Sequence, residues 1–203
     1  MTEHSRETIL KVEDLNVKFS LRGRVLHAIR GVGLDIYKGE SLAIVGESGS
    51  GKTVLTKTFT GLLDQNGWVD SGSIWFEGQD LARFKTEKEW LKIRGRKIAM
   101  VLQDPMTSLN PLKTIGRQIA EALELHQGMK GDAAKKRTQE ILLDVGIQEP
   151  QRRMKQYPHQ FSGGMRQRVV IAIAAACQPE ILICDEPTTA LDVTIQAQIL
   201  DLI

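Results

Sequence analysis

The sequence has few of the features that mark exported, metal-binding or membrane-spanning proteins. Only two of its 203 residues are cysteines, Cys177 and Cys184, and both lie in apolar runs without the spacing of metal ligands. We therefore expect them to be core thiols of a protein in a reducing compartment. The opening residues MTEHSRETIL lack the apolar core of a signal peptide, and no run approaches the roughly 18 apolar residues of a membrane-spanning helix. If the protein works at a membrane, we expect it on the cytoplasmic face, bound to a protein that spans the bilayer.

The sequence also has little excess of either positive or negative charge. The chain has 27 basic and 25 acidic residues, a net charge of +2, which is too small to indicate binding to nucleic acid or to an anionic surface. Hydrophobic residues make up 41% and charged residues 26%, as in an ordered globular protein. The length fits one domain, or one domain with a small insertion.

Apolar patterning predicts strands early in the chain and helices in its middle. Strands are expected over residues 9–19, 42–46, 72–78, 97–103 and 180–187, and two short strands over 25–37, broken at Gly31 and Gly33. Helices are expected over 52–63, over 114–146 with a break between Gly128 and Gly131, over 163–177 and over 193–203. This order predicts an α/β core that carries a helical insertion.

Residues 46–53 fit the phosphate-binding pattern G-x-x-x-x-G-K-[S/T]. Glycines allow backbone N–H groups to turn toward phosphates, the lysine reaches the terminal phosphates, and the hydroxyl after it binds Mg²⁺. A predicted strand precedes the motif and a predicted helix follows it, as the motif requires. The sequence therefore predicts a nucleotide site made of Gly46, Glu47, Ser48, Gly49, Ser50, Gly51, Lys52 and Thr53, with Thr53 as a metal ligand.

Two adjacent carboxylates end the apolar run 181–184. Phosphoryl transfer needs a carboxylate for Mg²⁺ and a group that orients the attacking water. We predict that Asp185 supplies the first and that Glu186, on the opposite side of the chain, supplies the second. An acidic pair after a strand can instead cap the next helix, but beside a phosphate-binding loop the catalytic interpretation is favoured.

Residues 161–168, FSGGMRQR, resemble the LSGGQ signature of ABC ATPases, placed shortly before the acidic strand as in that family. The resemblance implies that Ser162, Gly163 and Gly164, at a helix N-terminus, contact the γ-phosphate of ATP bound to a second ATPase subunit. Met165 stands where the family has glutamine. The implied fold is the α/β P-loop NTPase core of the ABC ATPase type, with an antiparallel β subdomain and a helical subdomain over 104–176.

Other positions match this family in order. Gln103 resembles the glutamine that touches Mg²⁺ and relays to the membrane domain, and Asp192, in ALD 190–192, resembles the aspartate that reaches across the dimer. Phe19 stands where the family stacks an aromatic ring on adenine, although a strand phenylalanine can also be core. His159 is interpreted as structural.

The finer resemblance is to the ATPase subunits of oligopeptide and dipeptide importers, in VGESGSGKT, QDPMTSLNP, YPHQFSGGMRQR and DEPTTALDVTIQAQIL. It implies an ATP- and Mg²⁺-dependent ATPase that pairs with a like or related ATPase, drives a permease, and serves an external substrate-binding protein indirectly. Nickel and glutathione importers share much of these motifs, so nickel and glutathione remain alternative solutes. The alternatives are a soluble ABC ATPase without a transport role and a module that uses ATP only as a switch.

The family continues past ALD to a strand that ends in a histidine, and no histidine follows Asp192. We therefore expect residues 1–203 to be a single, truncated nucleotide-binding domain. Such a fragment is expected to bind MgATP and to hydrolyse it slowly or not at all.

Overall fold

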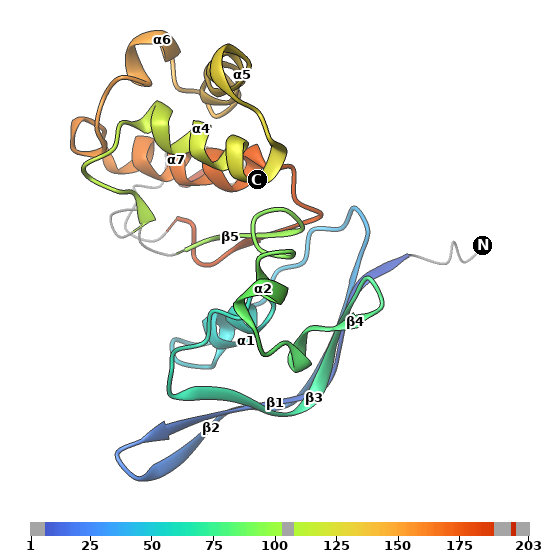
Figure 1. The fold of residues 1–203 in the computed structure, drawn as a ribbon. Coiled ribbons are helices and arrows are strands. Elements are labelled where there is room, and N and C mark those ends of the chain that lie inside the picture. The colour runs from blue at the N-terminus through green and yellow to red at the C-terminus, as the bar shows by residue number, and fades with distance from the viewer. Residues whose placement is uncertain (1–6, 103–107, 189–195, 198–203) are drawn as a thin grey trace, which may run out of the picture. The chain divides into compact units, whose positions relative to one another are not determined.

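A computed structural model describes residues 7–102, 108–188 and 196–197 (Figure 1). The chain divides into two compact units, residues 1–91 and 92–203. The first is built on an antiparallel sheet and the second on a parallel pair of strands covered by helices. The predicted limits of a helical subdomain at 104 and 176 remain a prediction.

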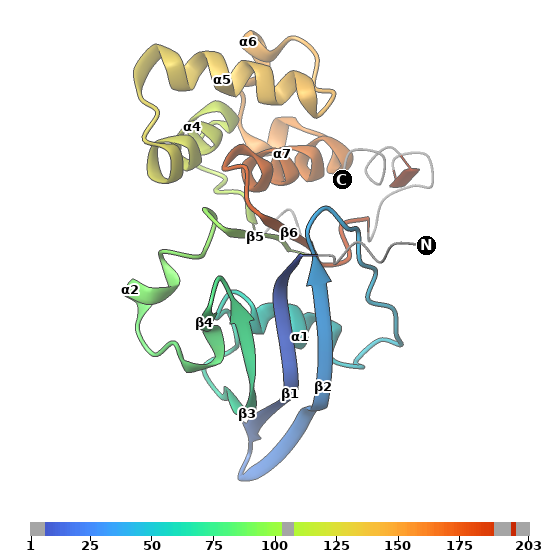
Figure 2. The ribbon, with the colours of Figure 1, turned by 90° about the vertical axis from the view of Figure 1, so that its right-hand side faces the viewer.

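The first unit contains a four-stranded sheet in the order β2-β1-β3-β4 (Figure 2). Strands β1 (Thr8–Leu21) and β2 (Arg24–Tyr37) form a long hairpin, β3 (Gly67–Phe76) pairs with the other edge of β1, and β4 (Gln79–Asp80) follows. The hairpin turns at Arg22 and Gly23, whose φ angles of 47° and 80° suit a two-residue turn. The short elements α1 (Lys52–Thr58), η1 (Leu81–Arg83) and α2 (Glu87–Trp90) complete this unit.

Two strand predictions in this unit are wrong. Residues 25–37 do not form two short strands, because β2 runs unbroken past Gly31 and Gly33 and its irregular pairing with β1 absorbs them. Residues 42–46 form no strand, and Val45 is 91% exposed. An apolar run becomes a buried strand only where neighbouring strands accept its backbone hydrogen bonds. Periodicity alone cannot supply that information.

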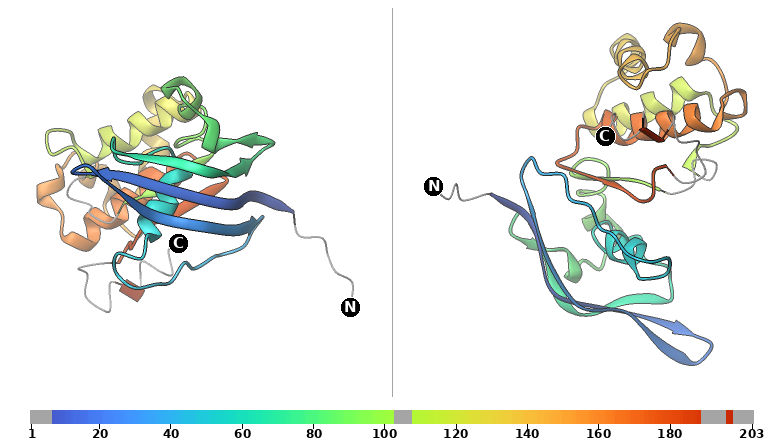
Figure 3. Two further views of the ribbon diagram at one scale, coloured as in Figure 1. Left: turned by 90° about the horizontal axis from the view of Figure 1, so that it is seen from below. Right: turned by 180° about the vertical axis from the view of Figure 1, so that it is seen from behind.

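The second unit places β5 (Ile98–Val101) parallel to β6 (Ile181–Cys184). Its helices are α4 (Ile115–Gln127), α5 (Gly131–Asp144), α6 (Pro150–Arg153), η2 (Pro158–Gln160) and α7 (Gly163–Ala176), and α4 lies beside α7 (Figure 3). The break at Gly128–Gly131 and the start of α7 at Gly163 are confirmed, and α7 ends one residue before its predicted limit. None of the helices in the described ranges is long and apolar enough to span a bilayer.

One apolar core joins these helices to the strands. Val101 of β5 belongs to the same buried cluster as the inner faces of α4, α5 and α7, and Leu182 and Cys184 of β6 pack against it. The apolar positions at helical spacing in α4 are fully buried, namely Ile115, Ile119 and Leu123. The helical layer and the two-stranded sheet are therefore one packed body.

Cys177 is buried, as predicted, and Cys184 is partly buried against the same core. Burial raises the pKa of the Cys177 thiol to about 11, and burial raises the pKa of the Cys184 thiol to about 11. At pH 8 such thiols are almost entirely protonated, and the thiolate is the nucleophile.

We predict that neither thiol reacts readily in the native protein. At pH 8 the labelling rate with a disulfide reagent should be roughly 100-fold below that of a free cysteine, should rise as the pH approaches 11, and should reach two thiols per chain in denaturant. Fast labelling of the native chain at pH 8 would show that the thiols are accessible and ionised.

Candidate functional site

The phosphate-binding motif forms a compact loop at the start of α1. The backbone N–H of Ser50 donates to the Glu47 carbonyl at 3.2 Å, which closes a turn inside the loop. The Lys52 amine folds back over the loop and donates to the carbonyl oxygens of Gly46 at 2.9 Å and Glu47 at 3.0 Å. These two bonds hold the amine beside the loop that the sequence pattern predicts to bind phosphate.

Gly51 is a position of this loop that requires glycine. Its φ of 97° lies in the left-handed region that favours glycine. A Cβ atom at Gly51 would also lie 2.8 Å from Cδ1 of Ile29 and 3.2 Å from the carbonyl oxygen of Ala28. The loop thus packs on β2 at Ala28 and Ile29, and the sequence pattern did not indicate these two contacts.

Phe19 lies on the same sheet, close to the contact between the loop and Ile29. Ile29 pairs with Val17 of β1, and Phe19 follows two residues later, opposite Leu26. At about 3.3 Å per residue, its Cα atom is roughly 7 Å farther along the strand. The Phe19 side chain is half-buried, so part of the ring is exposed. The first unit thus brings together the phosphate loop and the aromatic residue predicted to stack on a base.

The acidic pair follows β6 in the second unit. The backbone N–H of Asp185 donates to the Val101 carbonyl at 2.9 Å, and only 6% of this residue is exposed. Glu186 is exposed and has a φ of 47°, an unusual value for a residue other than glycine. Such strained positions concentrate at functional sites. The sharp change of direction places one carboxyl group in the interior and the next one at the surface.

The signature residues stand at the start of α7. Ser162 is the N-cap residue, and its Oγ accepts a hydrogen bond from the Met165 N–H at 3.3 Å. Gly163 and Gly164 form the first turn, in which backbone N–H groups lack partners within the helix. The sequence-based placement of this motif at a helix N-terminus is confirmed. His159, five residues before Gly164, stacks on Tyr157 with ring centroids 5.8 Å apart.

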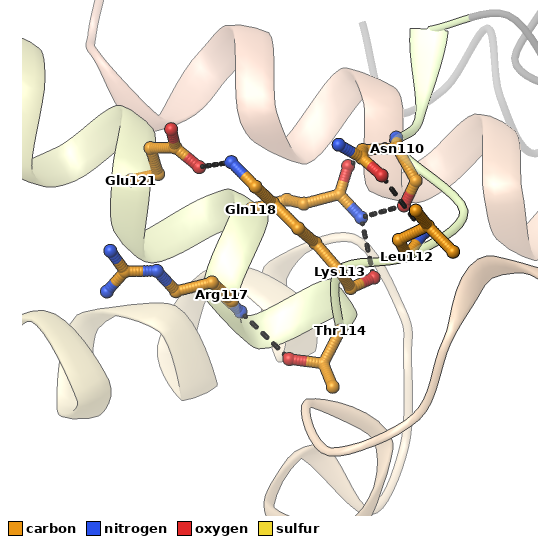
Figure 4. A network of polar contacts seen from close by, with 7 residues as sticks. All are labelled: Asn110, Leu112, Lys113, Thr114, Arg117, Gln118 and Glu121. Carbon is orange, nitrogen blue, oxygen red and sulfur yellow. Dashed lines mark hydrogen bonds and ion pairs between the residues drawn. The ribbon is translucent and has the colours of Figure 1, made fainter.

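Two predicted site residues, Gln103 and Asp192, lie outside the described residues. The loop that follows Gln103 is described from Ser108 onward and is held by the start of α4 (Figure 4). The Gln118 side-chain amide donates to the carbonyl oxygens of Asn110 and Lys113 at 3.1 and 3.0 Å, and the Lys113 amine pairs with Glu121 at 2.7 Å. Lys113 and Asn110 are therefore fixed to α4.

Residues 29–189 match the family model described as ABC transporter. The chain is 58% identical over 198 residues to the oligopeptide transport ATP-binding protein AmiE of Streptococcus pneumoniae, and 55% identical over 197 residues to the dipeptide transport ATP-binding protein DppD of Bacillus subtilis. These matches cover 98% and 97% of this chain but only 56% and 58% of the relatives. The chain thus spans little more than half the length of these relatives.

Among solved structures, the ATP-binding cassette MJ0796, in a dimeric post-hydrolysis state with ADP and Pi, matches with a TM-score of 0.83 at 30% identity. The match covers 95% of this chain and 80% of that one. The predicted fold class, an α/β P-loop core of the ABC ATPase type, is confirmed by this likeness. Because the family model matches residues 29–189, which is most of this chain, the chain belongs to the ABC transporter family.

Proposed function

We propose that this chain binds ATP with Mg²⁺ at residues 46–53 and hydrolyses it. The observation that carries the proposal is the loop itself, in which the Lys52 amine is held over the carbonyls of Gly46 and Glu47 at the entry to α1. A cationic group fixed over a glycine-rich turn provides a site for a polyphosphate. Relatives named as transport ATP-binding proteins support this assignment.

The donor set fits Mg²⁺. The hydroxyl of Thr53 and the carboxylate of Asp185 are hard oxygen donors, the kind that this ion prefers, and the amide oxygen of Gln103 is a third. Bound Mg²⁺ would neutralise charge on the transferred phosphate. Asp185 is suited to this role because burial and its backbone bond to Val101 fix its position.

The other predicted site residues are proposed to activate the attacking water, to stack on the adenine or to contact the nucleotide of a second subunit. Glu186 is proposed to accept a proton from the attacking water, because it follows β6 and the residue is exposed. Phe19 is proposed to stack on the adenine ring. Ser162, Gly163 and Gly164, with Asp192, are proposed to contact the nucleotide of a second ATPase subunit, through the helix-start N–H groups of α7.

At the level of the whole protein, we propose that ATP hydrolysis drives import of oligopeptides or dipeptides. Relatives whose names specify oligopeptide and dipeptide transport support peptides over nickel or glutathione. The proposed partners are permease subunits, a second ABC ATPase of the same or a different kind, and indirectly a substrate-binding protein. The proposed location is the cytoplasmic face of the membrane. No nucleic-acid partner is proposed.

The test is to measure equilibrium MgATP binding and steady-state hydrolysis of this chain as functions of its concentration. Binding that requires Mg²⁺, with slow hydrolysis whose specific activity rises with protein concentration, is the expected result for a site that a second subunit completes. Binding without turnover would restrict the proposal for this chain to nucleotide binding. No binding at millimolar MgATP would overturn the proposal.

A further inference from the structure

Gly67, the first residue of β3, lies directly opposite Phe19 of β1. A Cβ atom at Gly67 would lie 2.5 Å from Cε1 of Phe19 and 2.9 Å from both Cδ1 and Cζ. The backbone φ of Gly67 is outside the left-handed region, so other residues could adopt its conformation. What glycine provides here is space, because the phenylalanine ring occupies the position of the missing side chain.

Hydrogen bonds next to this pair hold the two strands together, so the strands resist moving apart to relieve such an overlap. The Ser20 N–H donates to the Asn66 carbonyl at 2.8 Å, and the Asn66 side-chain amide donates to the Ser20 carbonyl at 3.0 Å. The Gly67 N–H donates to the Asp64 carbonyl at 2.8 Å. A side chain at residue 67 would therefore displace the ring rather than the strand.

We propose that Gly67 is a positioning residue for the nucleotide base. One face of the Phe19 ring rests on the Gly67 backbone, and the exposed part of the ring is held in a fixed orientation on the sheet that seats the phosphate loop. This inference rests on the proposed nucleotide site and on base stacking by Phe19. Gly67 acts through Phe19 and does not itself touch the base.

The test compares two ligands, MgATP and magnesium tripolyphosphate, which lacks a base and a ribose. In Gly67→Ala the displaced ring should weaken ATP binding roughly fivefold or more, within the range of a lost base–aromatic stack, and leave tripolyphosphate binding unchanged. Phe19→Ala should show the same selectivity with a larger loss. An equal loss for both ligands, or no loss for ATP in a folded Gly67→Ala protein, would overturn the proposal.

Gly33→Ala is the matched control. Gly33 also lies in a strand of this sheet without a left-handed φ, but a Cβ atom there would meet only the Val12 carbonyl, at an ordinary 3.6 Å. This variant should bind both ligands like the parent chain. A selective loss of ATP affinity in Gly33→Ala as well would show that any change in the sheet weakens base binding, against a specific role for Gly67.

A double substitution keeps the proposal testable if Gly67→Ala alone does not fold. With Phe19→Leu there is no ring to displace, so Gly67→Ala should cause no further loss of ATP affinity in that background. A further loss would overturn the positioning role. If the parent chain binds tripolyphosphate through Lys52 but ATP no more tightly, base stacking fails and the phosphate site stands. If it binds neither ligand, the proposed function fails with the inference.

Discussion

Replacing Lys52 by alanine is expected to weaken MgATP binding roughly 100-fold or more while the chain stays folded. A hydrogen bond to a charged group contributes about 1.5–3 kcal/mol, and the lysine offers more than one to a polyphosphate. The substitution also removes the two bonds by which the amine holds the carbonyls of Gly46 and Glu47. The check is equilibrium titration with MgATP, with circular dichroism to confirm that the chain is folded.

Lys57→Ala is the control for this prediction. Lys57 lies on the same helix, and its amine pairs with Asp64 at 3.5 Å near the surface, an interaction that contributes at most about 1 kcal/mol. ATP affinity in this variant should stay within about twofold of the parent chain, because Lys57 lies in the last turn of α1, at the opposite end of the helix from the loop. If the two lysine variants lose affinity equally, general charge and not the phosphate loop governs binding.

Glu186→Gln is expected to reduce the hydrolysis rate by roughly 10²–10⁴-fold and to leave MgATP affinity nearly unchanged. The amide has the size of the carboxylate but cannot accept the proton of the attacking water. Because Glu186 is exposed and follows the buried Asp185, the change should not disturb the core. Single-turnover hydrolysis at high protein concentration measures the rate, and a parallel titration measures the affinity.

Glu180→Gln provides the matched acidic control. Glu180 lies just before β6 and pairs with Lys97 at the surface, so its loss should change the hydrolysis rate by less than about twofold. If Glu186→Gln hydrolyses ATP at the rate of the parent chain, another group activates the water. If it loses ATP affinity as well, Glu186 contributes to binding and the proposed division of roles is wrong.

The helices of the second unit could be predicted because their signals are local. Thr114 caps α4 and Gly128 ends it, the apolar positions of α4 recur at helical spacing, and Ser162 begins α7. The phosphate loop was likewise contained in a short stretch of sequence. Each of these predictions depended on residues within about two turns of one another, where propensity and capping decide the structure.

The failures involve partners that are distant in the sequence. The apolar run at Val45 indicated a strand, but strand formation depends on neighbours that a local pattern does not identify. The seat of the loop on Ala28 and Ile29, and the space that Gly67 leaves for Phe19, depend on strand register. A glycine at the start of a strand is an ordinary sequence feature, and only the cross-strand pair gives it meaning.

The shared core of the second unit has a mechanical consequence. Close-packed interiors are nearly incompressible and transmit strain, and here the same apolar cluster contains the inner face of α7 and the side chains of β5 and β6 that contact it. A force applied to the helices therefore moves β6 as well, and with it the backbone of Asp185, which is bonded to Val101. The signature turn at Ser162 and the acidic pair at the end of β6 accordingly move together as parts of one rigid body.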